Sequence, residues 1–167
     1  MRRLPLVEAW LPRGAEAEQL AGLGGIVPAP IANRLEQRLS SQLKGGGEEE
    51  ILVSALIPYL EEYKSPPRLV ALTRSALFVI EEASGKSRRA STSRVDSTEQ
   101  VHRYALATIS SAQLRHSLLG SSLSIFVPQD DGHTLQHVFP FHSPAIAWFL
   151  PLYTRLRLLL SGPYRVR

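Results

Sequence analysis

The sequence predicts an α+β protein that is mainly β, with about seven short antiparallel strands and a helix near the C-terminal end. Two apolar runs, at residues 69–72 and 77–80, flank a short polar break, which is typical of a tight hairpin. Apolar and polar residues alternate over residues 122–127, the period of a half-buried strand. A leucine-rich segment then begins at Ser143-Pro144 and ends at Gly162-Pro163, which predicts a helix over the sheet.

The composition is that of one soluble domain with an appendage. The chain has 167 residues, of which 44% are hydrophobic. No apolar run approaches the roughly 20 residues that a membrane-spanning helix requires, so we expect no transmembrane segment. Cysteine is absent, which excludes disulfides and thiolate chemistry and is compatible with a reducing compartment. We expect a cytoplasmic protein, with a mitochondrial presequence left open by Arg2 and Arg3.

Residues 1–47 are predicted to form an N-terminal arm that contains one short helix, at residues 31–44. Pro30 suits the first helical turn, apolar residues recur along one face, and Gly45 ends the helix. Glycines and glutamates at residues 45–50 predict a flexible hinge into a main domain at residues 48–162. A basic tail, residues 163–167, follows.

The main domain is predicted to be a succession of strands. Pro58 indicates that the first of these strands is an edge strand or contains a bulge. Asp131-Gly132 is a strong hairpin pair, and the polar stretch at residues 83–100 predicts a long loop. The expected strands cover residues 51–59, 69–72, 77–80, 102–109 with a continuation through 113–118, 122–127 and 134–141.

The final helix is predicted to begin with Ser143 as its cap and Pro144 at its first position, and to kink at Pro151. Its buried stripe is expected to contain Ile146, Phe149, Leu150, Tyr153, Leu156 and Leu160. Apolar residues off that stripe suggest a partner, although packing against the N-terminal arm would explain them equally. The predicted partner contacts are Trp10, Trp148, Leu152, Arg155 and Leu159.

Residues 64–81, KSPPRLVALTRSALFVIE, are similar to the opening of the tail-homology domain of class I myosins, within the pleckstrin-homology-like superfamily. That family has an arginine, a leucine-rich strand that ends in Leu-Thr, and a second strand that begins at a small residue. Residues 104–127, YALATISSAQLRHSLLGSSLSIFV, are similar to its next strands. The matching positions are Arg68, Leu69, Leu72, Thr73, Ala76 and residues 78–80.

The resemblance covers roughly residues 48–161, without a motor, and implies a pleckstrin-homology-like barrel or sandwich. Such domains bind acidic phospholipids, including phosphoinositides, or protein surfaces. Lys64 and Arg68 match the basic residues that meet lipid phosphates in the family. Glu61 and Glu62 depart from that pattern and would repel a phosphate.

The loop at residues 83–100 offers a second anion-binding candidate, formed by Lys86, Arg88 and Arg89. The run Arg-Arg-Ala-Ser ending at Ser91 matches a basophilic kinase target, and a phosphate there would add about −1.5 to −2 charges to a basic loop.

No catalytic constellation, cofactor motif or metal site is predicted, and we expect a non-enzymatic protein. Gly85-Lys86-Ser87 lacks the upstream glycine of a phosphate-binding loop. His133, His137 and His142 have no acidic or cysteine companion at a useful spacing.

Three functions follow from these features. The first is an adaptor or structural subunit that docks through a pleckstrin-homology-like domain within a larger cytoskeletal, for example axonemal, assembly. The alternative is a peripheral membrane protein that binds acidic phospholipids, which the formal net charge of +4 and the absence of acidic residues after Asp131 favour. A ribosome- or RNA-associated role is the weakest, because no platform of interleaved aromatic and basic residues supports it.

Overall fold

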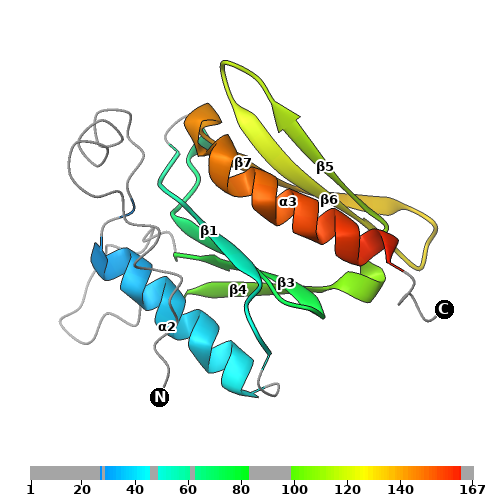
Figure 1. The fold of residues 1–167 in the computed structure, drawn as a ribbon, viewed down its shortest axis with the longest axis horizontal. Helices are drawn as coiled ribbons and strands as arrows, with labels where there is room; N and C mark the ends of the chain where they lie inside the picture. Colours follow the sequence, from blue (N-terminus) through cyan, green and yellow to red (C-terminus); the bar gives the residue numbers. More distant parts are fainter. Residues whose placement is uncertain (1–26, 28, 46–48, 61–62, 83–98, 163–167) are drawn as a thin grey trace.

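The computed structural model describes residues 27, 29–45, 49–60, 63–82 and 99–162 (Figure 1). Within them the chain is α+β and mainly β. Helix α2 comes first, seven strands follow, and helix α3 comes last. In chain order the elements are α2 (Ala29–Gly45), β1 (Val53–Ile57), β2 (Arg68–Leu72), β3 (Ala76–Glu81), β4 (Gln100–Ala105), the 3₁₀ turn η2 (Leu106–Thr108), β5 (Ser111–His116), β6 (Ser121–Pro128), β7 (Thr134–Phe141), the 3₁₀ turn η3 (Ser143–Ala145) and α3 (Ile146–Ser161).

The strands form two antiparallel sheets in which neighbours in sequence are neighbours in space. The first sheet has the order β1-β2-β3-β4 and the second the order β5-β6-β7. In the described residues the strands form two separate antiparallel sheets and no closed barrel. β1 is an edge strand, the first of the two alternatives that Pro58 indicates, and Pro58 itself directly follows the strand.

The predicted hairpin is confirmed as β2 and β3, with Leu72 opposite Leu77. Thr73 closes it. Its backbone N–H donates to the Ala76 carbonyl at 2.9 Å, and its hydroxyl oxygen accepts the Ala76 N–H at 3.0 Å and the Ser75 N–H at 3.3 Å. A buried threonine at this position therefore satisfies backbone donors that the turn leaves without a strand partner.

Both faces of the first sheet are covered, because α2 lies on one side and α3 with the second sheet on the other (Figure 1). On the α2 side, Leu69, Phe78 and Ile80 pack against Leu35 and Leu39. Coverage on both faces explains why β2 and β3 appear in the sequence as continuous apolar runs rather than as an alternation.

The larger core fills the space between the two sheets and α3. Its β3 and β6 members include Leu77, Leu123 and Ile125, all fully buried. The rings of Phe141 on β7 and Phe149 on α3 are stacked, with centroids 3.9 Å apart and an interplanar angle of 5°. These aromatic contacts hold α3 against the second sheet.

One expected strand is wrong: residues 102–118 are two strands in different sheets. The 3₁₀ turn η2 separates β4 from β5, and Leu106 and Ile109 are buried in the core at this crossing. The Leu106 N–H donates to the Ser75 carbonyl at 2.8 Å, which fixes the point where the chain leaves the first sheet.

The beginning and the buried side of α3 also differ from expectation. Ser143 makes no cap hydrogen bond; its hydroxyl donates to the Ser117 carbonyl, and η3 precedes the helix. Leu152 is fully buried, whereas Leu150, expected on the buried stripe, is 52% exposed. The helix continues through Pro151. Neither described helix is long and apolar enough to cross a membrane.

Several predicted features lie outside the described residues: the arm at residues 1–26 with Trp10, the hinge at 46–48, Glu61 and Glu62, the loop at 83–98 and the tail at 163–167.

Candidate anion-binding site

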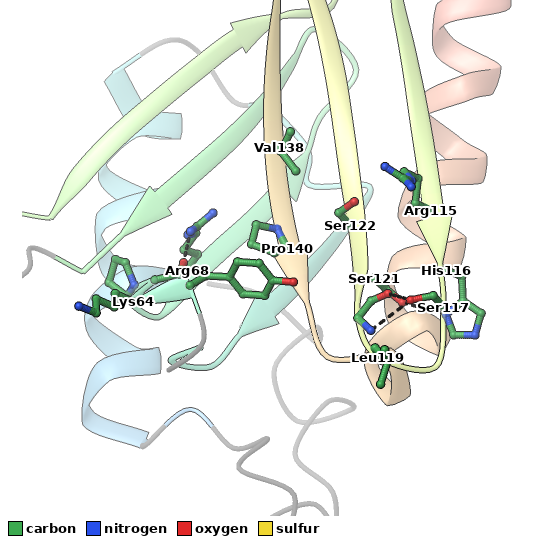
Figure 2. A pocket seen from close by; sticks show the side chains of 14 residues that line it. Lys64, Arg68, Arg115, His116, Ser117, Leu119, Ser121, Ser122, Val138 and Pro140 are labelled. Atoms are coloured by element: carbon green, nitrogen blue, oxygen red, sulfur yellow. Dashed lines mark hydrogen bonds between the residues drawn. The ribbon is translucent and has the colours of Figure 1, made fainter.

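A pocket of about 700 Å³ lies between the β1–β2 connection, the β5–β6 turn and β7 (Figure 2). It therefore joins the two sheets at one end of the molecule. Four of its lining residues are basic, and serine hydroxyls and the apolar side chains of β7 complete the wall. The basic lining residues are Lys64, Arg68, Arg115 and His116.

Lys64 belongs to a tight turn in the β1–β2 connection. Leu60 and Ser65 exchange two backbone hydrogen bonds of 3.0 Å each across this turn. Lys64 has a φ of 47°, in the left-handed region that a side chain with a Cβ rarely adopts. The turn thus holds an exposed ammonium group at the pocket in a conformation that glycine or asparagine would adopt more easily.

Arg68 is the first residue of β2 and is buried. Its Nη2 donates to the Ser65 hydroxyl, and its Nε lies 3.2 Å from Glu81 Oε1 on the neighbouring strand β3. Burial lowers the pKa of Arg68, and the Glu81 carboxylate opposes that shift. The guanidinium stays protonated, because an arginine pKa begins far above neutrality. Arg68 therefore provides the base of the pocket with a charge that Glu81 largely balances.

Arg115 and His116 end strand β5 on the opposite wall, and both are exposed. His116 Nδ1 is 2.8 Å from the hydroxyl oxygen of Ser121, which is buried at the start of β6. The Ser121 hydroxyl is within 3.5 Å of the Ser143 hydroxyl, which in turn donates to Ser117. This chain of polar contacts fixes the end of the β5–β6 hairpin against the beginning of η3.

The charge of the pocket is positive. None of its described lining residues is a carboxylate, and in the described part of the chain neither Lys64 nor Arg115 forms an ion pair. Two cations without a described carboxylate partner around one cavity suit a phosphate or another oxyanion, which accepts several charge-assisted hydrogen bonds.

The structure thus brings the predicted residues Lys64 and Arg68 together, and adds Arg115 and His116, which the sequence analysis did not select. Their only local signal is a basic pair directly before the turn in the run RHSLLG. Lys86, Arg88, Arg89 and the predicted phosphorylation site Ser91 lie outside the described residues.

The predicted partner contacts on α3 have different environments. Leu152 is fully buried in the core and presents no surface to a partner. Trp148 and Leu159 are partly buried and pack against the same core, and Arg155 is exposed. The outward apolar residues of α3 are instead Leu150 and Leu158.

The described histidines form no cluster with other ligands that could hold a metal ion. His137 pairs with Tyr104: its Nδ1 is 3.2 Å from the Tyr104 hydroxyl, and the ring centroids are 4.7 Å apart.

Comparison of the chain with protein-family models, with curated proteins and with solved structures gave no match. The pocket is therefore the feature from which we infer a function.

Proposed function

We propose that the protein is a non-enzymatic binding module that attaches to membranes containing acidic phospholipids, with the basic pocket as the headgroup site. The observation that carries this proposal is the convergence of Lys64, Arg68, Arg115 and His116, from both sheets, around one cavity without a described carboxylate in its lining. Lysine and arginine together provide a point charge and a planar fork of donors, which is a common arrangement for phosphate recognition.

The order of the elements supports a pleckstrin-homology-like fold for this module. A four-stranded antiparallel sheet, a three-stranded antiparallel sheet and a C-terminal helix follow one another, as the resemblance to class I myosin tails implies. In that family the basic residues near the first two strands meet lipid phosphates, and the resemblance assigns Lys64 and Arg68 to that position. The fold alone does not specify a ligand, so the charge of the pocket is the stronger argument.

Vesicle co-sedimentation tests the proposal. We expect binding to vesicles that contain phosphatidylserine or phosphoinositides, no binding to pure phosphatidylcholine, and weaker binding as salt is raised. The variant Lys64→Glu with Arg115→Glu reverses both uncompensated charges. At about 1 kcal/mol per charge near an anionic surface, four units of charge change should abolish measurable binding. Arg68→Glu is unsuitable, because it would place a second carboxylate beside that of Glu81.

The matched control carries the same change of charge at the other end of the molecule. Arg74, in the β2–β3 turn, and Arg157, in the last turns of α3, are both exposed. We expect Arg74→Glu with Arg157→Glu to retain most of the binding. An equal loss in both variants would mean that net charge alone, and not the pocket, determines attachment.

A second function, a protein-docking adaptor within a larger cytoskeletal assembly, is favoured by one observation. Leu150 and Leu158, eight residues apart on α3, are 52% and 58% exposed and share one outward face. Affinity purification tests this function: a co-purifying assembly that Leu150→Asn with Leu158→Asn abolishes would support docking through α3. In that case the pocket variants should leave the assembly intact.

A further inference from the structure

The β5–β6 turn presents two leucines at its tip. Ser117 and Gly120 close the turn: the Ser117 N–H donates to the Gly120 carbonyl at 3.2 Å, and the Gly120 N–H donates to the Ser117 hydroxyl at 3.2 Å. Between them Leu118 and Leu119 are 96% and 93% exposed. β5 ends at His116, β6 begins at Ser121, and neither leucine has a positive φ. Connections of this kind ordinarily hold polar residues or glycine, so neither turn geometry nor hydration explains this pair of leucines.

The leucine tip lies on the rim of the basic pocket. Leu119 is itself a lining residue, and Arg115 and His116 directly precede the turn (Figure 2). Tyr63, from the β1–β2 connection, reaches the same turn: a Cβ atom added to Gly120 would lie 3.3 Å from the Tyr63 hydroxyl. The rim therefore combines apolar side chains, a half-exposed tyrosine and uncompensated cations within one small area.

We propose that Leu118 and Leu119 insert into the apolar part of an acidic bilayer while the pocket holds a headgroup phosphate. This inference depends on the proposed function and names the second component of attachment. A bilayer offers both chemistries, with anionic phosphates at the surface and hydrocarbon just below them. Tyrosine is enriched at that boundary. Stable peripheral anchoring ordinarily needs two such signals, one apolar and one basic.

One double variant removes the apolar signal without disturbing the turn. Both leucines are almost fully exposed, and asparagine and glycine are common turn residues, so we expect Leu118→Asn with Leu119→Gly to retain thermal stability. Vesicle affinity should fall by about tenfold or more. Burial of even part of two leucine side chains contributes more free energy than the about 1.4 kcal/mol that corresponds to a tenfold change in affinity.

The matched control is Leu150→Asn with Leu158→Asn, which removes from α3 two exposed leucines that do not line the pocket. We expect its vesicle affinity to change by less than about twofold, because substitutions outside the proposed membrane contact should not alter the binding equilibrium. Circular dichroism and thermal melting should show that both double variants are folded.

Insertion can also be observed directly, because the chain contains no cysteine. A polarity-sensitive fluorophore on Leu119→Cys should shift to the blue on acidic vesicles, and lipids that carry a spin label on the acyl chain should quench it. The same fluorophore on Leu150→Cys should show neither effect.

The outcomes separate the two proposals. If the unmodified chain does not bind acidic vesicles, both the proposed function and the insertion are refuted. If it binds, but the Asn-Gly variant binds equally and the fluorophore at position 119 stays in water, insertion alone is refuted. Dimers in the absence of lipid that the Asn-Gly variant abolishes would also refute insertion, because the tip would then be an interface between two copies.

Discussion

Lys64 occupies a left-handed backbone conformation, with a φ of 47°, that costs a side chain with a Cβ about 1–2 kcal/mol. The turn maintains it because Leu60 and Ser65 exchange two hydrogen bonds and Tyr63 donates its N–H to the Leu60 carbonyl at 3.2 Å. Backbone strain of this kind is concentrated at functional sites, where the surrounding structure holds a side chain in place. The retained strain is consistent with a role for Lys64 beyond that of a solvated surface residue.

His137 should make the stability of the fold depend on pH. Burial lowers the pKa of His137 from its usual value near 6.5, and the charge of His102 lowers it further. The unfolded chain therefore takes up a proton at a higher pH than the folded protein does. The stabilising contribution is complete above pH 6.5 and is lost as the pH falls from there through the folded pKa.

The variant His137→Gln tests this dependence, because glutamine can still pair with the Tyr104 hydroxyl but does not titrate. Urea denaturation above and below pH 6.5 should show a smaller loss of stability on acidification in the variant than in the unmodified chain. His133→Gln, at an exposed position, serves as the control. Identical losses in the His137 variant and the unmodified chain would contradict the prediction.

At the scale of single elements, the packed side of α3 should determine the stability of the larger core. Leu152→Ala removes a fully buried side chain between α3 and the sheets, and we expect a loss of about 2–5 kcal/mol in the free energy of unfolding. Leu150→Ala, on the outward face, should change it by less than about 0.5 kcal/mol. Chemical denaturation measures both values, and equal effects would mean that α3 packs on a different side.

The elements that could be predicted from the sequence are those whose signals are local. The β2–β3 hairpin follows from two apolar runs around Thr73, and the β6–β7 hairpin from Asp131-Gly132, where Gly132 has a φ of 84°. The packed side of α3 could not be predicted, because leucines occur around most of the helix and their period does not select one face. The break between β4 and β5 depends on the position of the second sheet, which no short window of sequence contains.

Only half of the basic pocket could be predicted from the sequence. Lys64 and Arg68 were identified through the family resemblance, which concerns adjacent strands. Arg115 and His116 follow about 50 residues later in the chain, and they reach the pocket only because the β5–β6 turn meets the β1–β2 connection. The same contact between the β5–β6 turn and the β1–β2 connection places Leu118 and Leu119 on the rim of the pocket. No contiguous sequence motif therefore marks either the pocket or the two leucines.

At the scale of the whole molecule, the first sheet is a shared layer with a helix against each face. Leu35 and Leu39 of α2 are buried against one face, whereas α3 and the second sheet cover the other. Ion pairs connect α2 to the same sheet region, since Arg34 contacts Glu82 and also Glu99, the latter at 3.9 Å. By this packing α2 belongs to the fold that builds the pocket, although the predicted domain boundary places it in the N-terminal arm.

A fragment of residues 48–162 tests that boundary, because it retains both sheets and α3 but lacks α2. Its loss of Leu35 and Leu39, at about 1.5–3 kcal/mol for each buried leucine, should remove about 3–6 kcal/mol, a large part of the roughly 5–15 kcal/mol that stabilises an ordinary domain. We expect a lower melting temperature, dye binding to the uncovered sheet and aggregation on size-exclusion chromatography. In the full chain, Leu35→Ala with Leu39→Ala should reproduce the lower melting temperature, whereas Arg38→Ala, on the exposed side of α2, should not. A fragment that melts as the full chain does would show that α2 is an appendage and that the module ends at the predicted boundary.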